Sequence, residues 1–175
     1  MKPITKENIQ LRHFKKEDAE GVQRLANHPE LAKMIGLPHP YLLSYAEAWI
    51  RSQPEAIRRG SEYPYAIICD DQLVGTITLR IDRSNNIGEL GYWIGREYWG
   101  KGIATEAARQ IIRFGFYELA LHKIHASALL RNPGSQRVLE KAGLSREGVR
   151  KEHRLLLGVY EDIVLYGLLK KLSFE

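Results

Sequence analysis

Two spacings of apolar residues divide the chain into segments of different kinds. Near-alternating apolar and polar positions, as at Ile9, Leu11 and Phe14, are typical of strands. We expect further strands over residues 65–69, 73–81, 88–94, 123–130, 148–157 and 160–169. Apolar residues three or four positions apart predict helices over residues 16–35, 44–60, 103–119 and 132–143.

The order of these segments predicts a mixed α/β domain with helices on both faces of one sheet. The helix between strands 88–94 and 123–130 forms a strand–helix–strand unit, which should make these two strands a parallel pair. Pro38 and Pro40 predict the end of the first helix, and Ser44 followed by Glu47 predicts a capping box for the second. No internal repeat or interdomain linker is visible, so we expect a single domain spanning residues 1–175.

Composition narrows the functional classes only slightly. The apolar fraction of 44% is ordinary for a globular protein, and the net charge of +5 suits an anionic ligand as well as a merely basic surface. Cys69 is the only cysteine, and its place in an apolar run favours a buried, unreactive thiol. The segment from Met1 to Lys6 lacks the apolar core of a signal peptide, and no apolar run is long enough to span a bilayer. We therefore expect a cytoplasmic protein with no membrane partner.

The loop before the helix at 103–119 carries the clearest chemical signal. Gly100 and Gly102 stand one residue apart at the start of this helix, where backbone N–H groups and the helix dipole favour an anion. The segment from Gly95 to Lys101 matches the start of a nucleotide-binding P-loop, but Gly102 stands where that motif needs Ser or Thr to hold magnesium. The spacing also fails the dinucleotide-binding fingerprint. The glycines alone indicate either an anion site or a simple turn with a helix cap.

The wider sequence resembles one enzyme family. The segments Glu89-Leu90-Gly91-Tyr92-Trp93-Ile94 and Tyr98-Trp99-Gly100-Lys101-Gly102-Ile103-Ala104-Thr105-Glu106-Ala107 resemble the acetyl-CoA-binding motif of GNAT acetyltransferases. Within that superfamily they look most like the RimJ/RimL branch of ribosomal-protein N-terminal acetyltransferases. Asn132 to Ser135 is similar to the family's Asn-x-x-Ser motif, and Tyr160 to Tyr166 is similar to the closing strand of the branch. The resemblance implies the GNAT fold, a mixed, mostly antiparallel sheet of about seven strands with a splayed parallel pair, flanked by about four helices.

The resemblance also implies a cosubstrate, acetyl-CoA, and no metal. Pantetheine would lie between the two splayed strands, and the pyrophosphate would lie on the glycine loop. The residues implied to bind the coenzyme are Tyr92, Trp93, Ile94, Trp99, Gly100, Lys101, Gly102, Ile103, Ala104, Thr105, Asn132 and Ser135. Trp99 departs from the family, which has Gln or Arg there. We expect the side chains of residues 92–94 to be plain core, and Asn132 can also cap its helix.

Amide formation needs an uncharged amine and a proton donor for the leaving thiolate. Many family members supply a Tyr seven residues after the Asn, but Leu139 occupies that position here. Ser135 is therefore the candidate acid, unless it only favours the first turn of its helix. Glu89 is the candidate base, in the branch's Glu-x-Gly-Tyr-Trp pattern, or else a strand carboxylate paired with an arginine. The Glu that the branch uses on its penultimate strand is Arg154 in this chain.

The acceptor is less well defined by the sequence. Asp162 and Tyr166 are candidates to line the acceptor cleft, although Tyr166 can equally be a packing residue. Trp49 is either core or a wall of that pocket. We expect acetyl transfer to a primary amine, on a protein N-terminus or a small molecule, by direct attack in a ternary complex. A non-catalytic CoA sensor is the alternative, because Leu139 and Arg154 replace family residues. A nucleic-acid-binding module would need an aromatic and basic recognition motif, and none is present, so no nucleic-acid partner is expected. The resemblance is also compatible with a homodimer.

Overall fold

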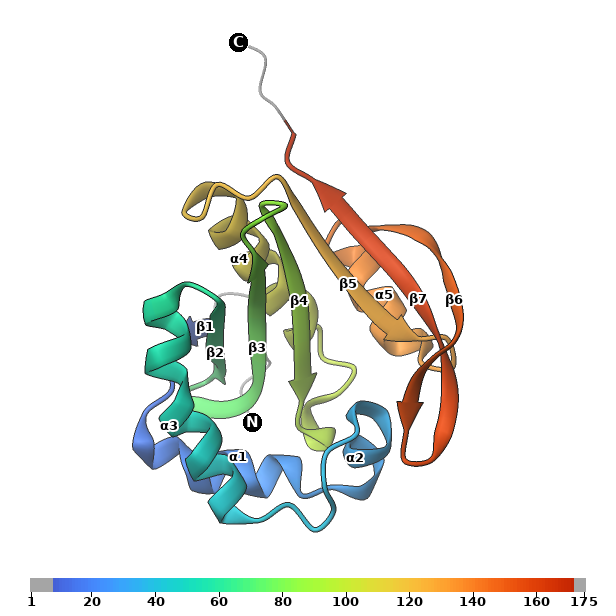
Figure 1. The fold of residues 1–175 in the computed structure, drawn as a ribbon. Coiled ribbons are helices and arrows are strands. Elements are labelled where there is room, and N and C mark those ends of the chain that lie inside the picture. The colour runs from blue at the N-terminus through green and yellow to red at the C-terminus, as the bar shows by residue number, and fades with distance from the viewer. Residues whose placement is uncertain (1–7, 172–175) are drawn as a thin grey trace.

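The computed structural model describes residues 8–171, so the segment from Met1 to Lys6 lies outside the described residues. Its centre is a seven-stranded sheet with the order β1-β2-β3-β4-β5-β7-β6 (Figure 1). The strands are β1 (Ile9–Arg12), β2 (Glu62–Cys69), β3 (Gln72–Asp82), β4 (Ile87–Ile94), β5 (Lys123–Leu129), β6 (Ser145–Leu156) and β7 (Val159–Leu169). Only β4 and β5 are parallel neighbours, and the other pairs are antiparallel. The predicted mixed sheet and its parallel pair are confirmed.

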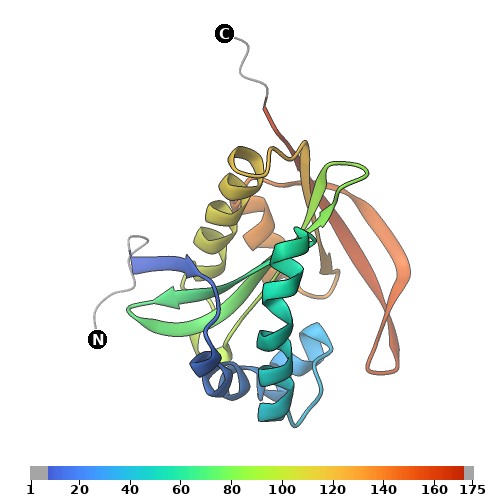
Figure 2. The ribbon, with the colours of Figure 1, turned by 60° about the vertical axis from the view of Figure 1, so that its left-hand side comes forward.

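Helices cover both faces of this sheet, as predicted. They are α1 (Ala19–Ala26), α2 (Pro29–Ile35), α3 (Leu43–Arg59), α4 (Ile103–Tyr117) and α5 (Pro133–Lys141). Figures 1 and 2 show α1 and α3 on one face and α4 and α5 on the other. A large apolar cluster lies under α4 and α5, and a smaller one lies under α1 and α3. Strands β2 and β3 are therefore largely buried on both faces, which explains their almost continuous apolar character.

Two glycines allow α4 to lie close to the start of the parallel pair. A Cβ atom at Gly88 would lie 2.8 Å from Leu121 Cδ1, and one at Gly115 would lie 2.8 Å from Ile124 Cδ1. These distances are shorter than packed carbon atoms tolerate, so larger residues would push the helix away from the sheet. The close packing fixes the direction of α4 and therefore the place of its N-terminus at the end of β4.

The first predicted helix, over residues 16–35, is wrong as a single element. A 3-10 turn, η2 (Lys16–Asp18), precedes α1, and α1 and α2 are separate helices. The break follows from local chemistry: Pro29 is the first residue of α2, and the His28 ring accepts a hydrogen bond from the Glu30 N–H at 3.3 Å. Gly36 then ends α2 in the left-handed conformation, at φ 75°. The described part of the chain thus contains five α-helices where the resemblance implied about four.

Other boundaries also differ from the predictions. The capping box is wrong, because α3 begins at Leu43 and Ser44 lies inside its first turn. Phe14 lies outside β1 and packs edge-on against Trp49, with ring centroids 4.9 Å apart. Strand β2 begins at Glu62, three residues before the predicted start. Within residues 8–171, no helix is long and apolar enough to cross a membrane.

Candidate active site

A cleft opens where the two parallel strands separate. Strands β4 and β5 pair only over Ile87–Lys123, Gly88–Ile124 and Glu89–His125. Beyond Glu89, β4 continues beside β3 alone, while β5 continues beside β7 (Figure 1). The space between the diverging strands is part of a cavity of about 850 Å³, which we call the cleft. On its β5 side, β4 therefore offers backbone polar groups to a ligand in place of a neighbouring strand.

All of the predicted coenzyme-binding residues and both catalytic candidates line this one cleft. They come from β4, from the loop and first turn of α4, and from the start of α5: Glu89, Tyr92, Trp93, Ile94, Trp99, Gly100, Lys101, Gly102, Ile103, Ala104, Thr105, Asn132 and Ser135. The segments are far apart in the sequence, so the sheet topology alone brings them together. Their individual roles remain predictions.

The glycine loop has the geometry of an anion site at a helix N-terminus. Gly100 and Gly102 both have positive φ values, 73° and 78°, and a Cβ atom at either position would meet nothing within 4 Å. Gly102 is the N-cap of α4 and makes no side-chain cap, so the helix's first N–H groups have no internal acceptor. Their shared direction and the helix dipole favour a bound phosphate. Thr105 is buried in the same turn, at 7% exposed.

Trp99 anchors this loop to the end of β4. Its indole Nε1 donates a hydrogen bond of 2.7 Å to the carbonyl of Ile94, and the Arg96 guanidinium lies 4.7 Å above its ring. The indole cannot accept a hydrogen bond, and its single donor is used within the chain. Trp99 therefore holds the loop in place, which explains how the position tolerates a departure from the family's Gln or Arg.

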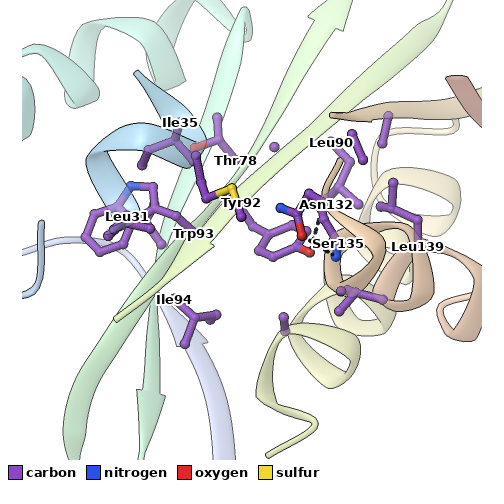
Figure 3. A pocket seen from close by; sticks show the side chains of 18 of the residues that line it. Leu31, Ile35, Thr78, Leu90, Tyr92, Trp93, Ile94, Asn132, Ser135 and Leu139 are labelled. Carbon is purple, nitrogen blue, oxygen red and sulfur yellow. Dashed lines mark hydrogen bonds between the residues drawn. The ribbon is translucent and has the colours of Figure 1, made fainter. Parts of the chain in front are cut away.

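A short hydrogen-bonded chain crosses the cleft from α5 to β4. The Asn132 side chain caps α5 by accepting from the Ser135 N–H at 3.1 Å, and the Ser135 hydroxyl lies 3.0 Å from the Tyr92 hydroxyl (Figure 3). The N-cap prediction for Asn132 is confirmed. Burial raises the pKa of Tyr92, and the bond to Ser135 opposes that shift. The prediction of a plain core side chain at Tyr92 is incomplete, because its hydroxyl makes this hydrogen bond in the cleft.

Glu89 faces the cleft from β4 and is half-buried. Arg80 is its cross-strand neighbour on β3, but the Arg80 guanidinium pairs with Glu62 at 3.3 Å. Among residues 8–171, no hydrogen bond or ion pair engages the Glu89 carboxylate. The alternative of a carboxylate tied to an arginine is therefore not what the structure shows, and Glu89 is left available to a ligand.

The remainder of the cleft has an apolar wall and a few polar groups. The wall comes mainly from α2, α3 and β4 and consists of Leu31, Met34, Ile35, Leu37, Tyr41, Trp49 and Trp93. Trp49 lines the cleft and also packs against the smaller core, so its core interpretation is confirmed. The polar groups include Thr78, Arg80, Ser127 and Arg154, and Arg154 donates to the Ser127 hydroxyl at 3.2 Å. The alternation of Thr76, Thr78 and Arg80 along β3 could have indicated that these side chains share one polar face of the sheet. No pattern in the sequence of α2 indicates that this helix lines the cleft.

Helix α2 is attached to the segments that follow both diverging strands, β4 and β5. On the β4 side, Arg96 pairs with Glu30 at 2.6 Å, and this hydrogen bond lowers the pKa of the Glu30 carboxyl. On the β5 side, Arg131 donates to the carbonyl of Lys33 at 3.1 Å and pairs with Glu161 at 2.7 Å. The helix therefore bridges the opening between the strands and carries its apolar residues to the cleft.

Two predicted cleft residues lie elsewhere. Asp162 binds Lys151 at 2.9 Å, and Tyr166 is buried, with its hydroxyl donating to Glu140 at 3.0 Å. Neither lines the cleft, because their strand β7 lies beyond β5. Cys69 is buried as predicted, and burial raises the pKa of its thiol. Among residues 8–171, no three His, Cys, Asp or Glu side chains form a group that could hold a metal ion.

Comparisons with known proteins agree on one family. A family profile described as an acetyltransferase (GNAT) domain matches residues 8–145. The probable N-acetyltransferase YjcK of Bacillus subtilis is 35% identical over 80% of each chain. The putative ribosomal N-acetyltransferase YdaF of Bacillus subtilis is 38% identical over 60% of this chain and 58% of its own. Among solved structures, RimL, a ribosomal L7/L12 α-N-protein acetyltransferase in complex with coenzyme A, has a TM-score of 0.87 at 19% identity, covering 95% of this chain and 96% of its own.

Proposed function

The chain belongs to the GNAT family of N-acetyltransferases, and we propose that it moves the acetyl group of acetyl-CoA to a primary amine by direct attack in a ternary complex. One observation carries this proposal: the predicted coenzyme-binding residues and both predicted catalytic residues line a single cleft. We take the whole chain to act as one acetyltransferase domain. A cytoplasmic location is part of the proposal, since it would give the enzyme access to acetyl-CoA.

The coenzyme would lie along the separation of β4 and β5. Its pyrophosphate would accept hydrogen bonds from the first turn of α4, where Gly100 and Gly102 leave room for it. Lys101 lines the same end of the cleft and adds positive charge. The amides of pantetheine would pair with β4 beyond Glu89, where that strand has lost its β5 neighbour. The thioester would then lie near Ser135.

The chemistry assigned to the two catalytic candidates follows from their positions. Glu89, unpaired within the described chain, takes a proton from the incoming ammonium, directly or through water, so that a neutral amine can attack the carbonyl carbon. Ser135, on the opposite side of the cleft, donates a hydrogen bond to the sulfur as the carbon–sulfur bond breaks. A serine hydroxyl is a weak acid, so stabilising the thiolate is its expected contribution.

We propose a peptide N-terminus as the first acceptor to test. The apolar wall suits the side chains of a peptide, and one relative, YdaF, is named a putative ribosomal N-acetyltransferase. Arg154, where the branch has Glu, gives the pocket a different charge from that of such relatives. A small-molecule amine is the second acceptor class.

A homodimer belongs to the same proposal. Four apolar side chains at the tip of the β6–β7 hairpin are more than half exposed: Leu155, Leu157, Val159 and Tyr160. Apolar groups gathered at one exposed place are typical of interaction surfaces. Sedimentation equilibrium would report the oligomeric state.

The function is tested by measuring thiol release from acetyl-CoA with a panel of peptides and small amines. Turnover with at least one acceptor, and initial-rate lines that intersect when both substrates are varied, would support direct attack in a ternary complex. The alternative, a CoA sensor, predicts tight acetyl-CoA binding without turnover of any acceptor. Parallel lines would contradict direct attack, because they indicate a covalent acetyl-enzyme.

A further inference from the structure

Tyr92 and Ser135 lie on opposite sides of the cleft, and their side chains contact each other across it. Tyr92 comes from β4 and Ser135 from the first turn of α5, and their hydroxyl oxygens are 3.0 Å apart. Figure 3 shows the Tyr92 ring reaching from β4 toward Ser135 and Asn132. Nothing in the sequence indicates this contact, because the residues are 43 positions apart.

We propose that Tyr92 is a positioning residue for acetyl transfer: its phenolic O–H donates to Ser135 Oγ and thereby directs the serine hydrogen toward the departing sulfur. This inference rests on the proposed function and deepens it, since it assigns a side-chain role to a residue otherwise expected to bind coenzyme only through its backbone.

The direction of the hydrogen bond follows from the chemistry of the two groups. Each hydroxyl has one hydrogen and can also accept. A phenol is more acidic than an aliphatic alcohol and is the better donor, so the favoured arrangement has Tyr92 donating. The single Ser135 hydrogen is then free, and donation from Tyr92 polarises the serine O–H and strengthens it as a donor.

Both partners are held in place by the surrounding fold. The Ser135 backbone N–H is bound to the Asn132 side chain, which fixes the first turn of α5. The Tyr92 ring packs against the large apolar cluster. Burial raises the pKa of the Tyr92 phenol, so it stays protonated and able to donate well into the alkaline range. Both hydroxyls are therefore in place before the reaction begins, and donors that need no reorganisation stabilise a developing charge effectively.

The sequence supplies a reason for this arrangement. Leu139, one helical turn beyond Ser135, is 2% exposed and lines the cleft. Its side chain has no hydrogen to donate, so Leu139 adds no donor beside the serine hydroxyl. The β4 tyrosine adds a second hydroxyl from the opposite side.

The step balances without a proton leaving Tyr92 or Ser135. Glu89 first takes one proton from the substrate ammonium and releases it to solvent. The neutral amine nitrogen then forms a bond to the carbonyl carbon and gives a second proton to Glu89, and the carbon–sulfur bond breaks with its electron pair on sulfur. Ser135 stabilises the resulting thiolate by a hydrogen bond, and Tyr92 holds Ser135 in the donating orientation. The thiolate then takes a proton from solvent, and Glu89 returns its proton to solvent.

The test compares four variants of the full chain: Tyr92→Phe, Ser135→Ala, the double variant and the control Tyr65→Phe. Tyr65 is a half-buried tyrosine of β2 that packs on Phe114, outside the cleft. Ser135→Ala loses a hydrogen bond to the charged thiolate and should lower kcat by roughly 10- to 100-fold, whereas Tyr92→Phe loses a neutral hydrogen bond and should lower kcat by roughly 2- to 10-fold. Acetyl-CoA affinity should be unchanged in both single variants. Because Tyr92 acts through Ser135, the double variant should lose no more than Ser135→Ala does. The control should keep the wild-type kcat.

Several results would overturn the inference. Wild-type turnover in Tyr92→Phe would show that the phenol is not needed, and losses that multiply in the double variant would show that Tyr92 acts independently of Ser135. Weaker acetyl-CoA binding at unchanged kcat would assign Tyr92 to binding instead. The failure of the proposed function is distinguishable, because the wild-type protein itself would then release no thiol with any amine, and the inference would fall with it. Phenylalanine keeps the packed ring, and a thermal unfolding curve for each variant confirms that it is folded.

Discussion

Gly102 is the position at which one substitution should separate coenzyme binding from folding. It is the N-cap of α4 at φ 78°, with nothing within 4 Å of a Cβ atom built there. Gly102→Glu therefore causes no steric clash. It only forces a residue with a side chain into the left-handed backbone conformation, which lowers the free energy of unfolding by roughly 1–2 kcal/mol. Domains of ordinary stability, about 5–15 kcal/mol, tolerate that loss. The variant should fold.

The expected loss of binding comes from charge. A carboxylate about 4 Å from a phosphate, at an effective dielectric constant near 20, is repelled by about 4 kcal/mol. Every 1.4 kcal/mol corresponds to about tenfold in affinity, so acetyl-CoA should bind about a thousandfold more weakly. Displacement of the phosphate from the helix N–H groups would add to this loss.

Isothermal titration calorimetry with acetyl-CoA, at one ionic strength, measures the effect. Gly158→Glu is a matched control, because Gly158 has a φ of 81° with nothing within 4 Å and lies in the turn between β6 and β7, away from the cleft. The control carries the same strain and charge and should bind acetyl-CoA like the wild-type protein. Wild-type affinity in Gly102→Glu, or an equal loss in Gly158→Glu, would refute the placement of the pyrophosphate on the loop.

Three further changes address catalysis, packing and pH. Glu89→Gln should lower kcat by about 100-fold or more, alter its pH profile and leave acetyl-CoA affinity near the wild-type value, and steady-state rates across pH check this. Ile111→Ala, at a fully buried position of α4, should lower the free energy of unfolding by roughly 2–5 kcal/mol in urea titrations. Burial raises the pKa of Asp18, but hydrogen bonds from Arg12 and the Lys15 N–H outweigh burial and lower the pKa overall. The charged Asp18 therefore stabilises the folded state above about pH 4, and this stabilisation is lost as pH falls through the folded-state pKa. Asp18→Asn should therefore flatten the acid limb of a plot of Tm against pH.

The sequence was most informative where local chemistry fixes the backbone. Gly102 before α4 and Asn132 before α5 mark their helix starts correctly, because the N-terminus of a helix depends on the few residues around it. The parallel pair followed from chain order and the handedness of crossover connections. These local and topological signals, with the family resemblance, were enough to select coenzyme residues that line one cleft.

The predictions failed where tertiary packing, and not local sequence, determines the structure. The periodicity over residues 16–35 continues through the break at Pro29, since both helices present apolar residues to the same interior. Ser44 has the sequence of a cap, but α3 begins two residues too early for Ser44 to be its N-cap, which is Leu42. Of the two interpretations of Tyr166, cleft residue or packing residue, the structure shows packing, because its strand lies beyond β5 and its side chain is buried. Contacts between distant segments, such as Tyr92 with Ser135, leave no periodic trace in the chain.

The central claim, that acetyl-CoA occupies this cleft, is tested most directly by a crystal structure of the protein with acetyl-CoA bound. We expect pyrophosphate oxygens within hydrogen-bond distance of the backbone N–H groups at Gly102 to Thr105, pantetheine beside β4 beyond Glu89, and the thioester sulfur within reach of Ser135 Oγ. Coenzyme bound anywhere else on the protein, or bound here with its thioester directed away from Glu89 and Ser135, would contradict the account.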